Sequence, residues 1–379
     1  MRSSRRTRKS LRSLALGATL VAGACAAACG SGSDSAGPSC TPGAAGVDKG
    51  GAFAPTLDAY CMVSVQGSAV VPSAAEVTPY DVNTPLFSDY AVKYRTVWLP
   101  PSTSVAYNAQ GRFEFPVGTV ITKSFGFPAD FRVANAPVKW RETRVLIRAA
   151  AGWTGSSYIW DDAQKVAQVS AGGEIETFSF IDAEGNTQSP NYLVPSQAEC
   201  KKCHANDGDM ITLGPGAAQL NRDFAYPSGS ENELAHWSRV GLLSGAPSPA
   251  QAPKLAVWDD PTTGDTATRA RAYLQANCSY CHNGSGEART TGLVLTSSAD
   301  SDAYALGICK PPVAAGKAAE NEHYDIVPGH PEQSILVYRM QSTAPSIMMP
   351  EIGRSLEHIE AVQLVSDWIA GLSGSCTSP

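Results

Sequence analysis

Two short motifs of cysteine and histidine stand out in this chain of 379 residues. Residues 200–204 read CKKCH, and residues 278–282 read CSYCH. Two thiols three positions apart, followed at once by an imidazole, form the spacing typical of covalent attachment of a c-type haem. Both thiols can bond to the haem vinyl groups from one short turn, and the histidine is then held over the iron as its proximal ligand. The expected haem thiols are Cys200, Cys203, Cys278 and Cys281, and the expected iron ligands are His204 and His282.

Two other kinds of site use paired cysteines. Two Cys-x-x-Cys pairs could supply the ligands of a zinc ion, and a single pair could form a thioredoxin-like redox centre. Neither requires a histidine directly after the second cysteine, yet both motifs have one in a chain with only six histidines. The spacing therefore favours two covalently bound haem c groups.

The start of the chain has the pattern of an export signal. Residues 2–12 are basic, and residues 14–28 form an apolar run rich in alanine and glycine that is too short to span a bilayer. Cys29, followed by a flexible Gly-Ser segment, is similar to the lipidated cysteine of a bacterial lipoprotein, and Cys25 is a second candidate. The alternative is simple cleavage and release. We expect a periplasmic protein or an outer-membrane-associated lipoprotein.

The charge of the chain bears on its partners. The formal net charge is −6, and loss of the basic start would make it more negative. Nucleic acid is therefore not an expected partner. Redox proteins are the expected partners, together with a membrane reached through the lipid anchor.

Four of the ten cysteines lie outside the haem motifs and the export signal. They are Cys40, Cys61, Cys309 and Cys376. An even number in an oxidising compartment predicts two disulfides, for which three connectivities are open. Pairing Cys40 with Cys61 and Cys309 with Cys376 would keep each bond inside one region.

Residues 56–195 have the pattern of a β domain, preceded by a flexible tether at residues 29–55. Short runs rich in β-branched and aromatic residues alternate with turn signals, a spacing typical of a sandwich or barrel. No carboxylate pair, nucleophile triad or phosphate loop has a persuasive spacing here, so catalytic residues stay unknown. The expected strands are residues 90–99, 119–125, 144–149, 157–160, 166–169 and 176–181.

At Ser196 the pattern changes. Residues 196–199 (SQAE) form a capping box, which predicts a helix that delivers the first motif. Gly214-Pro215-Gly216 follows shortly after, and here the chain resembles a class I cytochrome c. The resemblance implies that the Pro215 carbonyl would accept a hydrogen bond from Nδ1–H of His204, which fixes the ring. An ordinary loop proline is the alternative.

The distal ligand of the first haem has no clear candidate. A helix is expected over residues 230–243, and His236 on that helix is the nearest histidine, although one helical histidine is more often a core or surface residue. An open iron, or a ligand from another domain, is the other interpretation.

The second motif is followed by a more complete pattern. Residues 247–265 form a proline-rich linker, and a helix is expected over residues 266–275 before the motif. The apolar stripe of residues 359–372 predicts a closing helix. Before that helix, Met348-Met349-Pro350 resembles the distal-ligand segment of bacterial class I cytochromes, which implies Met349 as the sixth ligand, or else Met348. A core methionine is the alternative.

A longer resemblance covers most of the chain. Residues 79–90 (PYDVNTPLFSDY) are similar to the opening of a family of predicted secreted bacterial dihaem proteins. The later parts of that family resemble residues 220–223 and 348–351.

These patterns predict a multidomain fold: an all-β, sandwich-like N-terminal domain at 56–195, then two α-helical cytochrome c-like haem modules at 196–246 and 266–379. The expected function is electron transfer between partners at the bacterial cell envelope. One alternative is a dihaem redox enzyme, peroxidase-like or an oxidase, with an open first haem. The other is a partner- or glycan-binding envelope protein with accessory haems.

Overall fold

The computed structural model describes residues 40–313, 316–319 and 322–376. The predicted export segment and both lipidation candidates, Cys29 and Cys25, lie outside the described residues. From Cys40 onward the chain forms one compact unit. The domain boundaries expected inside that unit stay predictions.

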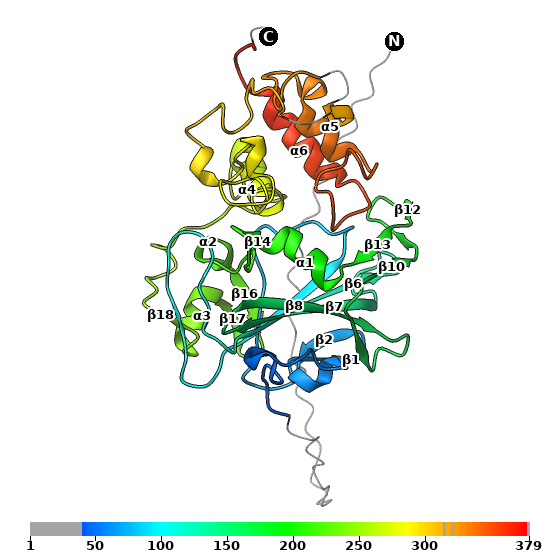
Figure 1. The fold of residues 1–379 in the computed structure, drawn as a ribbon, viewed down its shortest axis with the longest axis vertical. Coiled ribbons are helices and arrows are strands. Elements are labelled where there is room, and N and C mark those ends of the chain that lie inside the picture. Colours follow the sequence, from blue (N-terminus) through cyan, green and yellow to red (C-terminus); the bar gives the residue numbers. More distant parts are fainter. Residues whose placement is uncertain (1–39, 314–315, 320–321, 377–379) are drawn as a thin grey trace, which may run out of the picture. The chain divides into compact units, whose positions relative to one another are not determined.

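A six-stranded antiparallel sheet is the largest element of the structure, with the strand order β3-β4-β6-β7-β8-β9 (Figure 1). All the expected strands except the last lie in this sheet, because their β-branched and aromatic residues fit a pleated, buried surface. Its strands are β3 Thr78–Tyr80, β4 Val92–Trp98, β6 Val120–Pro128, β7 Val138–Ala149, β8 Gly152–Trp160 and β9 Ala167–Ser170.

Both faces of this sheet are covered. On one face, Val145 and Ile147 pack with Leu57 and Tyr60, which precede the sheet in sequence. Residues one position away point to the opposite face, because strand side chains alternate. On that opposite face, side chains of β4 and β6 pack with Leu220 and Trp237, which follow the sheet in sequence. The first CKKCH segment therefore folds back onto the sheet.

Short antiparallel pairs and one parallel pair surround the large sheet. The antiparallel pairs are β1 Val63–Gln66 with β2 Ala69–Pro72, β10 Glu174–Thr177 with β13 Asn191–Val194, β11 Phe180–Ile181 with β12 Thr187–Gln188, β14 Ala205–Asn206 with β15 Asp209–Met210, and β16 Asp223–Tyr226 with β17 Gly229–Asn232. The parallel pair is β18 Leu243–Ser244 with β5 Val105–Ala106.

The described α-helices are short. They are α1 Gln197–His204, α2 Ala217–Leu220, α3 Glu233–Arg239, α4 Thr266–Asn277, α5 Ile335–Gln341 and α6 Ile359–Ala370. Single 3₁₀ turns occupy Val47–Lys49, Leu57–Tyr60, Arg289–Thr291, Ser297–Ala299, Gly316–Ala319 and Pro331–Gln333. None of the helices in the described ranges has the length and apolar character needed to cross a bilayer.

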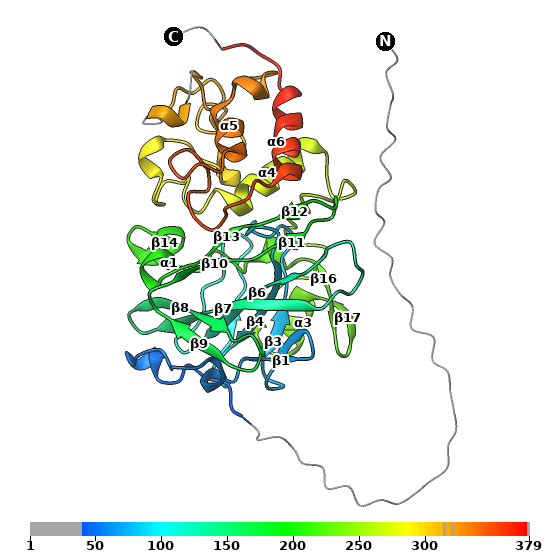
Figure 2. The same cartoon turned by 90° about the vertical axis from the view of Figure 1, so that its right-hand side faces the viewer.

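Helices α4, α5 and α6 share a separate apolar cluster (Figure 2). Tyr273 and Leu274 of α4 pack in it with Val365 and Trp368 of α6. This cluster supports the segment that carries the second motif.

The predicted fold class is wrong in its α-helical part. The region expected as a first helical module, residues 196–246, consists of short strand pairs and three helices of eight residues or fewer. One of its strands, β18, pairs with β5 from the preceding region. The region expected as a second helical module is largely loops and single turns around α4, α5 and α6. Helical cytochrome modules are therefore not what the chain forms.

Local turn chemistry explains part of this difference. The helix expected over residues 230–243 is shortened to α3, because residues 229–232 pair as β17 before it and residues 243–244 pair as β18 after it. The sandwich expectation also fails, since a single large sheet is covered by turns, hairpins and short helices, with no second large sheet in the described ranges.

Candidate functional site

The first motif lies on helix α1, which begins with the expected capping box. The Ser196 Oγ accepts a hydrogen bond from the Glu199 backbone N–H at 3.2 Å, and Glu199 Oε2 accepts one from the Ser196 N–H at 2.9 Å. Both orphan donors of the helix start are thus satisfied. The helix presents Cys200 and Cys203, both partly exposed and neither in a disulfide.

A tight hairpin follows α1 and fixes the ring of His204. Asp207 and Gly208 connect β14 to β15 with positive φ angles of 49° and 91°, as the commonest two-residue hairpin turns require. The turn returns Ile211 to the end of α1, where its carbonyl oxygen lies 2.6 Å from Nδ1 of His204. A carbonyl can only accept, so Nδ1 carries the proton and Nε2 keeps its lone pair.

The structure gives Ile211 the role that the sequence assigned to Pro215. The Pro215 carbonyl instead accepts a hydrogen bond from the Phe113 backbone N–H at 2.9 Å. The β14–β15 turn is so short that it brings the carbonyl of Ile211, rather than that of Pro215, to the His204 ring.

His236 lies in surroundings different from those of His204. Its ring stacks on Tyr226 with centroids 3.4 Å apart, and its Nδ1 lies 2.9 Å from Glu231 Oε2. The neighbours of His204 are instead Ile211, Lys123 and Arg144. The structure therefore does not bring His236 to the first motif.

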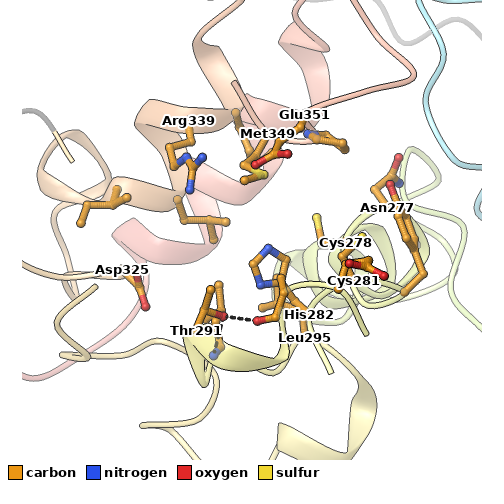
Figure 3. A pocket seen from close by; sticks show the side chains of 18 of the residues that line it. Asn277, Cys278, Cys281, His282, Thr291, Leu295, Asp325, Arg339, Met349 and Glu351 are labelled. Atoms are coloured by element: carbon orange, nitrogen blue, oxygen red, sulfur yellow. Dashed lines mark hydrogen bonds between the residues drawn. The ribbon is translucent and has the colours of Figure 1, made fainter. Parts of the chain in front are cut away.

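The second motif opens onto a cavity of about 530 Å³. Figure 3 shows His282 and Met349 pointing into the same space, with Cys278 and Cys281 beside them. The motif follows directly after α4, and Met349 follows α5, so two segments far apart in sequence face each other here. The volume is within the ~300–1,000 Å³ range of small-molecule and cofactor pockets.

His282 is half-buried against this cavity, and its buried Nδ1 atom is unsatisfied. Its Nδ1 has no hydrogen-bond partner among the described residues. Burial, together with the nearby cations Arg339 and Lys310, lowers the pKa of His282 to about 4. The imidazole is therefore neutral at physiological pH, which is the form that binds iron.

The loop that carries Met349 is held by a buried guanidinium. Arg354 donates to the carbonyl oxygens of Met349 at 2.9 Å, Ser342 at 2.8 Å and Arg339 at 3.2 Å. These bonds tie the loop to the end of α5. Met348, the alternative ligand, is buried but does not line the cavity. Of the two methionines, only Met349 faces the site.

The thiols of the second motif are neutral in this fold. Burial raises the pKa of both Cys278 and Cys281 to about 12. Burial also raises the pKa values of Cys200 and Cys203. Since the thiolate is the reactive form, the folded chain presents poorly nucleophilic cysteines.

Sequence reasoning missed His358 as a residue of this site. His358 lines the cavity, stacks on Phe87 at 4.1 Å between centroids, and has its Nδ1 3.0 Å from the Tyr273 hydroxyl. Burial lowers its pKa to about 3. No local spacing marks it, because its partners come from three distant segments.

The two motifs meet in space. The Cys281 thiol donates to the Lys202 carbonyl oxygen at 3.9 Å, and the Asp207 backbone N–H donates to the Ser285 carbonyl oxygen at 3.0 Å. The hydroxyl of Tyr280, inside the second motif, hydrogen-bonds to Cys203 in the first. Cys203 also lines the cavity of the second motif.

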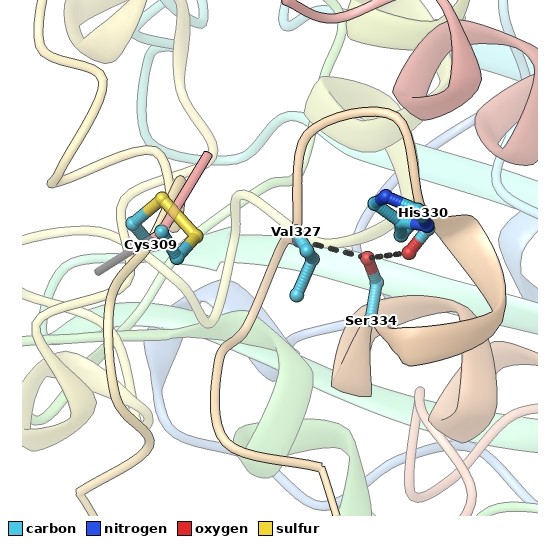
Figure 4. Close-up of a disulfide and its surroundings, with 5 residues drawn as sticks. Cys309, Val327, His330 and Ser334 are labelled. Carbon is cyan, nitrogen blue, oxygen red and sulfur yellow. Dashed lines mark hydrogen bonds between the residues drawn. A yellow bond between two sulfur atoms is a disulfide. The ribbon is translucent and has the colours of Figure 1, made fainter. Parts of the chain in front are cut away.

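The remaining cysteines form two disulfides. Cys40 pairs with Cys61, and Cys309 pairs with Cys376. Figure 4 shows the second bond near the loop in which the Ser334 hydroxyl accepts from the Val327 N–H and donates to the His330 carbonyl. The pairing is the one in which each bond stays inside one region, and it leaves the four motif cysteines unpaired.

The donor set at both motifs fits a haem. At each motif two unpaired thiols precede an imidazole, and the second motif adds a cavity with a thioether opposite. Within the described ranges, no group of three or more Cys, His, Asp and Glu side chains is arranged to hold a metal ion by itself. A haem iron needs only one or two protein ligands, because the porphyrin occupies four coordination positions.

Comparison with protein-family models, with curated proteins and with solved structures finds no match to this chain.

Proposed function

We propose that the chain carries two covalently attached haem c groups and transfers electrons between redox proteins at the bacterial cell envelope. Cys200 and Cys203 would hold one haem, and His204 would bind its iron. Cys278 and Cys281 would hold the other, and His282 and Met349 would bind its iron. When bound, each haem would supply one-electron redox chemistry at its iron.

The observation that carries this proposal is the shared cavity. It is lined by Cys278, Cys281, His282 and Met349 and also by Cys203 of the other motif. A zinc site would need four ligands converging on one point, whereas here the imidazole and the thioether face each other across a volume suited to a cofactor.

The attachment chemistry suits these cysteines. Each thiol adds its S–H across one vinyl double bond, so that sulfur bonds to one carbon and the hydrogen goes to the other. This addition of a thiol to a vinyl group consumes neither an oxidant nor a reductant. Because the folded thiols are neutral and only partly accessible, we propose that attachment takes place before folding is complete.

The proposed iron ligands also determine which haem would have the higher reduction potential. A thioether ligand raises the reduction potential of a haem. Met349 would therefore give the site at the second motif the higher reduction potential of the two. The contact between the Cys281 thiol and the Lys202 carbonyl places the two attachment segments next to each other. The path for electrons between the two haems would therefore be short.

Electron paramagnetic resonance combined with a potentiometric titration of the purified protein tests this function. We expect two one-electron waves at different potentials, with a low-spin ferric signal from the haem held by His282 and Met349. The matched double variant Cys200→Ser/Cys203→Ser should keep that signal and lose the lower wave. A high-spin haem that binds cyanide or turns over peroxide would instead contradict a pure electron carrier.

A further inference from the structure

Four cationic side chains lie together on one face of the six-stranded sheet. Arg95 on β4 is directly opposite Lys123 on β6, and Lys123 is directly opposite Arg144 on β7. Residues opposite each other in antiparallel strands lie on the same face. Lys93 is two positions before Arg95 and shares that face. We call Lys93, Arg95, Lys123 and Arg144 the cation row.

The two arginines of the cation row are paired with carboxylates. Arg95 forms an ion pair with Asp81. Arg144 binds Glu142 through two hydrogen bonds, of 3.0 Å and 2.5 Å. Glu142 is fully buried and also accepts from the Tyr192 hydroxyl at 2.7 Å.

The two lysines of the cation row have no such partner. No carboxylate in the described part of the chain lies within ion-pair distance of Lys93 or Lys123. The Lys123 ammonium group lies 4.8 Å from the centre of the Phe125 ring, which is a cation–π contact and not an ion pair. Burial and the neighbouring Arg95 together lower the pKa of Lys93 to about 7, against the opposing effect of Asp81, and burial lowers the pKa of Lys123 well below its usual value.

Unpaired charges in partly buried positions are costly, and cations side by side repel one another. An anionic group over the sheet face would offset this cost and keep both lysines charged. The sheet itself supplies none beyond Asp81 and Glu142, which the arginines already engage.

The cation row faces the first motif. Arg144 is directly opposite Ser157 of the neighbouring strand β8, so the two side chains share this face of the sheet. The segment that carries the motif is fixed to the neighbouring strand β8, because Ser157 Oγ donates to the Pro195 carbonyl at 3.0 Å. The anion needed by the lysines would thus lie beside the expected first haem.

We propose that Lys93 and Lys123 bind the two propionate carboxylates of the haem attached at Cys200 and Cys203. Two unpaired ammonium groups match two carboxylates in number and in charge. This inference rests on the proposed function. A free dicarboxylate or phosphate ion offers the same chemistry, and the test separates the two sources.

Resonance Raman spectroscopy of the haem-loaded protein tests the inference, because the propionate bending bands respond to hydrogen-bond donors. We expect Lys93→Gln and Lys123→Gln each to shift the band of one haem and to lower the reduction potential of that haem. The potential falls because removing a nearby positive charge favours ferric iron. Lys123→Arg, which keeps the charge, should restore most of the native band.

Two kinds of control assign the effect. Lys139→Gln removes an exposed lysine on the same strand as Arg144, paired with Asp162, and should change nothing. The shift should persist when the second haem is removed by Cys278→Ser/Cys281→Ser, and it should vanish in Cys200→Ser/Cys203→Ser.

Each outcome is decisive. Unchanged bands and potentials in both glutamine variants, with two haems still bound, would overturn the propionate assignment. Phosphate or citrate binding to the wild type but not to Lys93→Gln/Lys123→Gln, again with unchanged bands, would assign the row to a free anion and also overturn it. A protein that purifies without haem would contradict the proposed function itself, and this result is distinguishable from a failure of the propionate assignment.

Discussion

The Sγ atom of Cys281 lies 3.9 Å from the carbonyl oxygen of Lys202, although 79 residues separate them in sequence. The relationship joins the two haem-attachment motifs directly. Haems held there would have neighbouring electronic transitions that couple. We expect a two-signed circular dichroism signal in the main haem absorption band of the wild type. Cys200→Ser/Cys203→Ser should reduce it to a signal of one sign, and a one-signed signal in the wild type would contradict the contact.

Met349 carries the ligand assignment at the second motif. Met349→Ala should remove the absorption band of methionine–iron ligation and lower the potential of one haem, because the thioether stabilises ferrous iron. Met348→Ala is the matched control. Met348 is buried away from the cavity, so we expect about 2–5 kcal/mol of lost stability and an unchanged spectrum. The opposite pattern in the two variants would exchange their roles.

His358 predicts a pH dependence of stability. Burial lowers its pKa from 6.5 to about 3, so folding favours the neutral ring. Its contribution is fully present above about pH 6.5 and is lost as the pH falls toward 3, by up to about 1.4 kcal/mol per pH unit. Denaturation by urea at several pH values should show a flatter profile for His358→Gln. His323→Gln, which removes an exposed histidine, is the matched control.

The two disulfides should contribute unequally to stability. The bond between Cys309 and Cys376 closes 67 residues, and that between Cys40 and Cys61 closes 21. Loop-closure entropy gives about 4 kcal/mol for the longer loop and about 3 kcal/mol for the shorter one. Urea denaturation of the paired serine variants measures both losses. Equal midpoints for both variants and the wild type would contradict the pairing.

The sequence predicted the strands better than the helices. Alternating β-branched and aromatic residues in 119–125 and 144–149 mark strands that the structure places side by side in the sheet. The helical modules failed because the expectation of cytochrome-like modules came from a family resemblance, whereas Asp207 and Gly208 follow the first helix with a hairpin. That Asp-Gly pair was a readable signal.

The site was predictable only where its chemistry is local. The thiols and imidazoles follow from spacing, and Met349 from the Met-Pro step after it. The resemblance implied the Pro215 carbonyl as the hydrogen-bond acceptor for His204, and this was wrong. The acceptor in the structure is the carbonyl of Ile211. The lysines of the cation row gave no local signal, since strand pairing alone brings them together.

The haem count of the purified, exported protein tests the central claim most directly. A pyridine haemochrome assay together with intact mass should give two covalently bound haem c groups per chain. Each paired serine variant, at Cys200 and Cys203 or at Cys278 and Cys281, should retain one. A wild-type chain whose mass carries no haem, or whose haem is removed by acidic acetone, would contradict the account.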